Sequence, residues 1–264
     1  MTFCALSSAK GMDIKMKKIV ALIGSRRKHG NTVSFIQAIL RDLPKEEYSI
    51  EYIFPQDFQI HSCIGCGSCF STIECTIKDE LPLLQKKILD SDLCIVASPV
   101  YVHYMTADLK IILDRCSWWV HTLRLQGKPI VVLSTCDCNG YRTVIEPLSE
   151  IMTFMGGNVI ATANGSQIPN QLNNEQWLNS ISDKISKRIK KYIELPPQSN
   201  KFLENNFSCM KQCMIWKDEL LKAQKVRNRE VDYWKESGML RCESFSDYLS
   251  FLDKDGREIQ LIGK

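Results

Sequence analysis

The chain has 264 residues, of which 44% are hydrophobic and 12 are cysteines. This length suits one α/β domain with an appendage better than two full domains. A net charge of +4 is too small to predict nucleic-acid binding, and no stretch has the length and apolar character of a signal peptide or a membrane span. We therefore expect a cytoplasmic protein with no nucleic-acid or membrane partner, whose clustered cysteines hold metal or carry out redox chemistry.

Residues 1–16 precede the first apolar run and are expected to form a loose arm. From residue 17, short apolar runs alternate with helical patterns, which predicts five strands joined by helices. The expected strands are 18–24, 48–54, 93–98, 129–135 and 158–162, and the expected helices are 32–43, 79–90, 106–118 and 143–155. Nearly continuous apolar strands such as 130–133 indicate a parallel sheet covered on both faces, and hence a doubly wound α/β fold.

After residue 175 the sequence becomes rich in charged residues. It predicts a helix over 177–193, stopped by Pro196 and Pro197, and a second helical stretch over 201–235. Aromatic residues among the charges of the second stretch predict that one face of it is docked. We expect a main domain over 17–195 and a helical C-terminal extension over 196–264.

Four cysteines form a C-x2-C-x2-C-x5-C run inside the loop 61–78, namely Cys63, Cys66, Cys69 and Cys75. Four thiolates on a short loop that contains glycine can converge on a [4Fe-4S] cluster. A zinc site would need two pairs of ligands separated by a longer spacer. The spacing therefore favours an iron-sulfur cluster, with zinc and unligated thiols as the alternatives.

The loop 24–32 lies between the first predicted strand and the first predicted helix, where backbone amides and the helix dipole favour an anion. Ser25, Asn31 and Thr32 add short polar side chains, and the basic run 26–28 adds positive potential. The loop has neither the P-loop spacing nor the dinucleotide fingerprint. It therefore predicts a mononucleotide phosphate site, and the alternative is an ordinary turn with Thr32 as the helix N-cap.

Two further loops follow strands and should emerge at the same edge of the sheet, because the carboxyl ends of parallel strands meet there. The loop 98–105 has aromatic residues around a proline and could support a flat ring, or else could cover the helix below it. The loop 135–140 completes the rim with Thr135, Asn139 and Gly140. Its Cys136 and Cys138 could be redox-active or bind metal, or be plain loop residues, since two cysteines cannot close a tetrahedral site.

Three segments carry a resemblance to known proteins. GSRRKHGNT resembles the phosphate loop of the flavodoxin-like NAD(P)H-dependent FMN reductases, and SPVYVHYMTADLKIILDR resembles their flavin-ring segment with the helix after it. CIGCGSCFSTIEC is similar to the cluster loop of iron-sulfur flavoproteins, which combine FMN with a [4Fe-4S] cluster. The similarity covers residues 17–162, and DYWKESGML resembles the tail of some relatives of the cluster type.

The resemblance implies a flavodoxin-like sheet of strand order 2-1-3-4-5 and assigns roles to particular residues. The implied FMN phosphate contacts are Ser25, Arg27, Asn31 and Thr32; the implied ring contacts are Pro99, Val100, Tyr101 and Val102; and the implied cluster ligands are Cys63, Cys66, Cys69 and Cys75. The third loop departs from the family, where it is usually rich in glycine, because Cys136, Asp137 and Cys138 are bulkier.

We expect from this an FMN-dependent oxidoreductase, in which NAD(P)H or another reduced donor loads FMN and electrons leave through a [4Fe-4S] cluster or directly to an acceptor. The chemistry takes place on FMN, so no catalytic triad or acid–base pair is expected. The alternatives are a non-catalytic FMN and iron-sulfur electron carrier, and an NAD(P)H:FMN reductase with no cluster. Flavodoxin-type carriers tend to be strongly acidic, which the charge of +4 disfavours.

The resemblance also implies self-association. Family members form dimers or tetramers, so a homodimer or homotetramer is expected, and a redox donor or acceptor protein is a candidate partner. Trp118, Trp119 and the C-terminal helices are the candidate surface for the self-association.

Overall fold

The structure is a computed structural model that describes residues 16–254, with the side chains of residues 253 and 254 excepted. The expected N-terminal arm therefore lies almost wholly outside the described residues. So do the last ten residues of the expected C-terminal extension. Within the described part, no helix is both long and apolar enough to cross a membrane.

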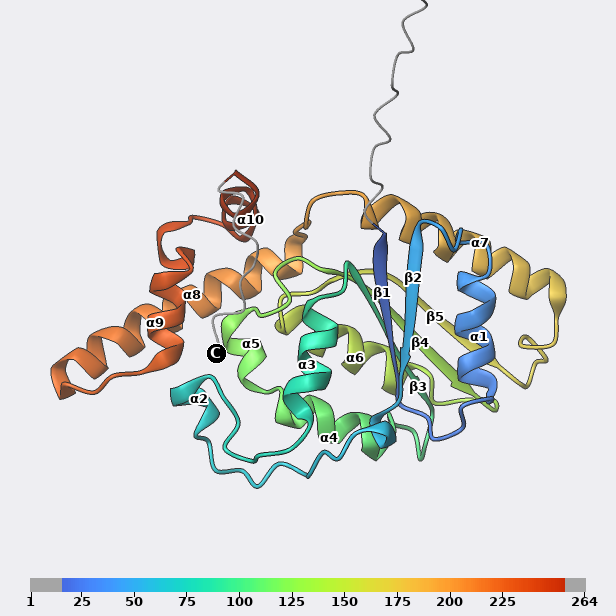
Figure 1. Cartoon of the computed structure of the whole chain (residues 1–264), viewed down its shortest axis with the longest axis horizontal. Helices are drawn as coiled ribbons and strands as arrows, with labels where there is room; N and C mark the ends of the chain where they lie inside the picture. Colours follow the sequence, from blue (N-terminus) through green and yellow to red (C-terminus); the bar gives the residue numbers. More distant parts are fainter. Residues whose placement is uncertain (1–15, 255–264) are drawn as a thin grey trace, which may run out of the picture.

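A five-stranded parallel sheet forms the centre of the molecule (Figure 1). Its strands are β1 (Lys17–Ile23), β2 (Tyr48–Ile53), β3 (Leu93–Pro99), β4 (Pro129–Cys136) and β5 (Asn158–Ser166). Their spatial order is β2-β1-β3-β4-β5, and every neighbouring pair is parallel. The predicted flavodoxin-like fold and strand order are thereby confirmed. The order reverses beside β1, and doubly wound sheets bind ligands at such a point.

Helices cover both faces of the sheet. One face is covered by α1 (Asn31–Leu40) and α7 (Glu175–Ile193), and the other by α3 (Leu81–Leu89), α4 (Ala107–Arg115), α5 (Trp118–Thr122) and α6 (Arg142–Phe154). Strand side chains alternate between the two cores: Ile19 and Ala21 pack with α1 and α7, whereas Val20 and Leu22 pack with the other helices. This two-sided burial explains the nearly continuous apolar strands.

The C-terminal helices are α8 (Lys201–Gln224), α9 (Arg229–Glu236) and α10 (Phe245–Lys254), with a short 3-10 turn at Met239–Arg241. They extend the core on the side of α5 and α6 (Figure 1). Trp234 is fully buried and donates a hydrogen bond from Nε1 to the His121 carbonyl oxygen at 2.7 Å. Phe207 packs against Trp234 with the ring centroids 5.5 Å apart. Aromatic side chains therefore dock the extension, as the sequence predicts.

Two predicted helices differ from the structure. The helix expected over 106–118 ends early, at Arg115: the chain turns at Cys116 (φ −100°, ψ 16°), and a separate helix, α5, begins at Trp118, with Trp118 and Trp119 in the core. The stretch expected over 201–235 is divided by Lys225, whose φ of 57° ends α8. α9 then starts at a new cap, where Asn228 accepts hydrogen bonds from the Glu230 and Val231 amides.

Candidate functional site

The loops after β1, β3 and β4 meet at one edge of the sheet and border a cavity of ≈ 400 Å³. The residues that line it are Ser25, Arg27, His29, Gly30, Asn31, Thr32, Pro99, Val100, Tyr101, Thr135, Cys136, Asp137 and Gln167. The structure thus brings most of the expected site residues together. The expected residues Val102, Asn139 and Gly140 are absent from this lining.

The N-terminus of α1 opens on this cavity. Its N-cap is Gly30, in an extended conformation, with no side-chain cap and no acidic residue in the first turn. The alternative in which Thr32 is the N-cap is therefore wrong: Thr32 is buried inside α1, and its Oγ1 lies 2.6 Å from Thr135 Oγ1. A helix end without a cap presents free amide donors and the positive end of the dipole, so it fits a phosphate group.

The three basic residues of the first loop have different partners. Arg26 forms a bidentate ion pair with Asp108 of α4 at 2.7 and 2.9 Å, and its hydrogen bond lowers the pKa of Asp108. Lys28 pairs with Asp57 at 2.6 Å. Both residues fasten the loop to neighbouring segments, whereas Arg27 lines the cavity. Arg27 is therefore the basic side chain of this loop that is placed to meet an anion there.

The second loop forms a tight hairpin in which the backbones of Tyr101 and Tyr104 are paired by hydrogen bonds of 2.8 and 3.0 Å. Val102 and His103 occupy its tip in left-handed conformations, with φ of 48° and 59°. Val102 is 97% exposed, so it points away from the cavity that Pro99, Val100 and Tyr101 line. The Val100 amide donates to the Thr135 carbonyl oxygen at 2.8 Å, which connects the second loop to the third.

In the third loop, Thr135, Cys136 and Asp137 reach the cavity. Gly140 instead allows a close approach between loops, since a Cβ at this position would lie 2.7 Å from Val100 Cγ1 and its φ is 81°. Gln167, which sequence reasoning missed, joins from the end of β5, and its amide donates to the Cys136 carbonyl oxygen at 3.1 Å. The sequence signal was the run of small residues that carries β5 beyond its predicted end.

The cysteine loop is turned by Gly65 and Gly67, whose φ values of 67° and 69° are left-handed. Cys63 and Cys66 are exposed, whereas Cys69 and Cys75, the other two cysteines of the run, are half-buried. Burial raises the pKa of Cys69, and the charges of the other three cysteines of the run raise it further. The pKa of Cys66 is lowered to about 7 by hydrogen bonds from Ser68.

Among residues 16–254, no group of three or more His, Cys, Asp or Glu side chains is arranged to hold a metal ion. A Cβ at Gly65 or Gly67 would meet no atom of the described residues within 4 Å, so these residues leave open space around the turns of the loop. The thiols of the loop are the type of ligand that iron-sulfur clusters use, and the left-handed glycines let the backbone turn around such a cluster.

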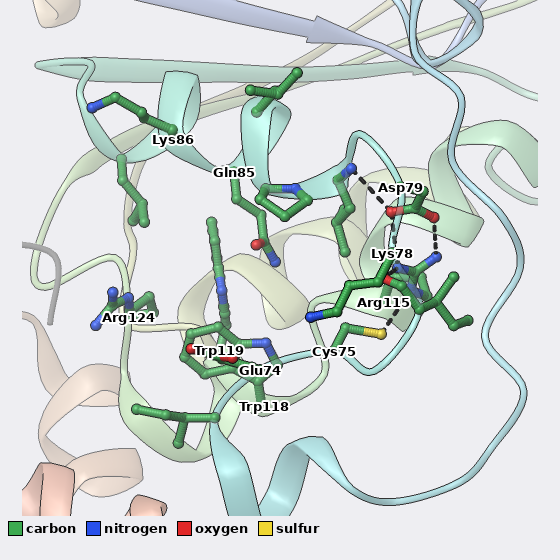
Figure 2. A pocket seen from close by; sticks show the side chains of 16 residues that line it. Glu74, Cys75, Lys78, Asp79, Gln85, Lys86, Arg115, Trp118, Trp119 and Arg124 are labelled. Carbon is green, nitrogen blue, oxygen red and sulfur yellow. Dashed lines mark hydrogen bonds and ion pairs between the residues drawn. The ribbon is translucent and has the colours of Figure 1, made fainter. Parts of the chain in front are cut away.

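A buried arginine fastens the fourth cysteine of this loop (Figure 2). The side chain of Arg115, at the end of α4, is 0% exposed and forms a bidentate ion pair with the Asp79 carboxylate, with N···O distances of 2.7 and 3.1 Å. Its Nε donates to Cys75 Sγ at 3.1 Å. Arg115 therefore fixes the position of Cys75 and places a cationic hydrogen-bond donor at its sulfur.

The C-terminal extension also holds the cysteine loop, which sequence reasoning missed. Lys217 of α8 and Asn228 both donate to the carbonyl oxygen of Phe70, in the short helix α2 (Cys69–Thr72), at 3.0 and 3.1 Å. The His121 ring stacks on Phe70 with the centroids 4.7 Å apart. Glu230, which is 0% exposed, pairs with both His121 and Lys217, at 3.0 and 2.7 Å. Three of these contacts, from Lys217 and Asn228 to Phe70 and from Glu230 to His121, join residues more than a hundred positions apart in the sequence.

The expectation that Trp118 and Trp119 form a surface for self-association is wrong. Trp118 is 6% exposed and Trp119 is 2% exposed, and both pack in the core of their own chain. The turn at Cys116 moves them there.

A family model described as NADPH-dependent FMN reductase matches residues 17–167, more than half of the chain. An iron-sulfur flavoprotein of Archaeoglobus fulgidus is 27% identical over 234 residues, which are 84% of this chain and 100% of that protein. An iron-sulfur flavoprotein of Methanocaldococcus jannaschii is 34% identical over 98 residues, which are 37% of this chain and 51% of that protein.

Solved structures show the same fold at low sequence identity. A flavone reductase superposes with a TM-score of 0.52 at 16% identity, over 69% of this chain and 66% of its own. RosB with bound 8-demethyl-8-formylriboflavin-5'-phosphate superposes with a TM-score of 0.51 at 14% identity, over 66% of this chain and 81% of its own.

Proposed function

Since the chain belongs to the NADPH-dependent FMN reductase family and is an FMN-dependent oxidoreductase, we propose that it takes electrons from NAD(P)H or another reduced donor and passes them through a [4Fe-4S] cluster to an acceptor. FMN supplies the exchange between two-electron and one-electron chemistry, and a cluster supplies one-electron transfer. The protein has to bind, orient and shield these groups. The observation that carries the proposal is the C-x2-C-x2-C-x5-C loop within an FMN reductase fold.

For FMN, we propose that the phosphate lies at the uncapped N-terminus of α1. Ser25, Arg27, Asn31 and Thr32 would hold it, because they line the cavity there. The ring would lie against Pro99, Val100 and Tyr101 of the hairpin. Thr135 would support the first loop through its hydroxyl contact with Thr32. Val102, Asn139 and Gly140 would act indirectly, by shaping the second and third loops.

For the cluster, we propose Cys63, Cys66, Cys69 and Cys75 as the ligands. The proposal is supported by the donor of Arg115 beside Cys75 and by the glycines that turn the loop. It is also supported by the name of the Archaeoglobus fulgidus relative, an iron-sulfur flavoprotein matched along its whole length. Hydrogen bonds to cluster sulfur raise the reduction potential, so Arg115 would favour the reduced cluster.

Replacing one proposed ligand tests the cluster. Anaerobically purified Cys66→Ser should keep its FMN but lose iron, sulfide and the broad visible absorption of a cluster. The matched control is Cys209→Ser, at an exposed cysteine of α8 outside the loop, which should keep iron and sulfide at the wild-type level. Full iron and sulfide content in Cys66→Ser would refute the ligand assignment. Zinc in place of iron in the wild-type protein would favour the alternative of a reductase without a cluster.

We also propose that the protein assembles as a homodimer or homotetramer through the C-terminal helices, where Trp216 and Leu220 of α8 are 62% and 59% exposed. Light scattering at micromolar concentration should give a multiple of the chain mass of 30.3 kDa. The double variant Trp216→Lys, Leu220→Lys should give a smaller species. A wild-type monomer would contradict this assembly.

A further inference from the structure

A second and larger cavity lies next to the cysteine loop. It has a volume of ≈ 750 Å³ and is bordered by α3, by the start of α5 and by the end of the cysteine loop (Figure 2). It shares no lining residue with the cavity proposed for FMN. In Figure 2 the indoles of Trp118 and Trp119 lie between Arg124 on one side and Cys75 on the other.

The wall of this cavity contains a largely buried cation. Arg124 is 8% exposed, its buried Nε has no hydrogen-bond partner, and its side chain forms no ion pair within residues 16–254. Its guanidinium lies over the rings of Trp118 and Tyr233, at 5.4 and 5.5 Å from their centroids. Cation–π contacts offset only part of the free energy needed to bury a charge. The site is therefore electrostatically incomplete without an anion.

Neighbouring groups point to the same kind of ligand. The Nε1 donors of Trp118 and Trp119 are buried and have no acceptor in the part of the chain that the structure describes. The other cations around the cavity differ from Arg124, because Arg115 is neutralised by Asp79 and Lys86 pairs with Asp90 at 2.8 Å. Lys78 and Glu74 are exposed, so their charges lie at the rim, in contact with water. The unmatched positive charge of the interior is therefore that of Arg124.

The apolar part of the lining sets the shape of the ligand. Two indoles and the side chains of Ile73, Leu81 and Pro82 surround the cavity. Flat aromatic surfaces favour a flat aromatic ring, which stacks in offset or edge-to-face geometry. A volume of this size suits a molecule of two or three fused rings.

We propose that this cavity is a separate ligand site that binds a flat aromatic carboxylate, with the carboxylate paired to Arg124 and the ring against Trp118 and Trp119. A ligand there lies beside Cys75. Binding requires neither FMN nor a cluster, so the inference goes beyond the proposed function and can fail independently of it.

Calorimetric titration of the anaerobically purified protein with naphthalene-2-carboxylate tests the site. One molecule should bind per chain, and the uncharged naphthalene-2-carboxamide should bind at least about tenfold more weakly, because a hydrogen bond between charged groups exceeds one to a neutral group. The absorption of the flavin should not change at saturation. No heat at millimolar carboxylate, or equal affinity for the two compounds, would overturn the proposal.

Two variants and one control locate the site. Arg124→Met should weaken carboxylate binding by about tenfold or more. It should not lower the melting temperature, because it removes a buried charge that has no partner. Trp119→Phe keeps an aromatic ring, removes one donor and should weaken binding several-fold. Arg41→Met, at a half-exposed arginine after α1, should bind like the wild type. Wild-type affinity in both Arg124→Met and Trp119→Phe would place the ligand elsewhere and refute the site.

Discussion

The charge at one helix end governs what the first loop can bind. Asn31 lies in the first turn of α1, which has no acidic residue, and its side chain lines the cavity. Asn31→Asp has nearly the same shape but adds a negative charge. It should stabilise the apo-protein by about 0.5 kcal/mol through the helix dipole. It should also weaken FMN binding by at least about tenfold, because the carboxylate repels the phosphate.

Fluorescence titration of the apo-protein with FMN and with riboflavin measures this effect. Riboflavin has no phosphate, so its affinity should be the same for Asn31→Asp and for the wild type. Equal losses for the two flavins would show that the substitution disturbs the ring site. They would contradict a phosphate at the N-terminus of α1.

The buried pair of Asp79 and Arg115 gives the stability of the protein a defined pH dependence. Burial disfavours the charged carboxylate of Asp79, but hydrogen bonds from Arg115 and from the His61 and Leu81 amides outweigh it and lower the pKa of Asp79 below 3.8. Because the pKa of Asp79 is lower in the folded state than in the unfolded state, the ionised carboxylate stabilises the fold in full when the pH is above the pKa of the unfolded state. This stabilisation is lost as the pH falls through the pKa of the folded state.

Asp79→Asn should therefore lower the free energy of unfolding by about 3 kcal/mol at pH 7, because Arg115 remains buried without its counter-charge. In urea unfolding of the apo-protein, the difference in the free energy of unfolding between wild type and variant should be constant from pH 8 to about pH 5. This difference should become smaller below about pH 4. A difference that widens towards low pH would contradict this account.

At the scale of elements, the C-terminal helices act as a clamp on the cysteine loop. Glu230 of α9 connects His121 of α5 with Lys217 of α8, and both contact Phe70 beside Cys69. Glu230→Gln should lower the free energy of unfolding by about 3 kcal/mol, because Lys217 loses its buried partner. It should also speed the alkylation of Cys69 in the apo-protein, measured by peptide mass spectrometry. Asp232→Asn removes a more exposed charge of α9 and should change stability by less than about 1 kcal/mol. Unchanged alkylation in Glu230→Gln would exclude the clamp.

The elements differ in how far the sequence predicts them. The strands were predictable because a sheet covered on both faces needs unbroken apolar runs, as in 130–133. The breaks at Cys116 and Lys225 were not, because neither residue is a helix breaker and burial of Trp118, Trp119 and Trp234 decides where the chain turns. Tertiary packing overrode the local helical preference there.

The candidate site, like the elements, could be predicted from the sequence only in part. The positions of Ser25, Pro99 and Thr135 were predictable, because each follows or ends a strand of a parallel sheet. Gln167 was missed because β5 runs further than its apolar pattern. The pairing of Arg115 with Asp79 and of Glu230 with His121 was unpredictable, since these contacts cross 36 and 109 residues of sequence and depend on the folded packing.

At the scale of the whole molecule, the fold places two sites on one body. The proposed FMN cavity lies at the carboxyl edge of the sheet, and the cysteine loop lies between α3, α4 and the C-terminal helices (Figure 1). α4 connects the two regions: Asp108 at its start holds the first loop through Arg26, and Arg115 at its end holds Cys75. A single short helix thus fixes the cysteine loop relative to the proposed flavin site.

Anaerobic titration with NADPH, followed by absorption and electron paramagnetic resonance on the same samples, follows electrons from the donor to the flavin and on to the cluster. The flavin band should bleach and a signal of a reduced [4Fe-4S] cluster should appear, with about four iron and four sulfide per FMN. A flavin that stays oxidised in NADPH would exclude this donor and leave another reduced donor to be identified. Protein that bleaches fully without iron, sulfide or such a signal would contradict the account.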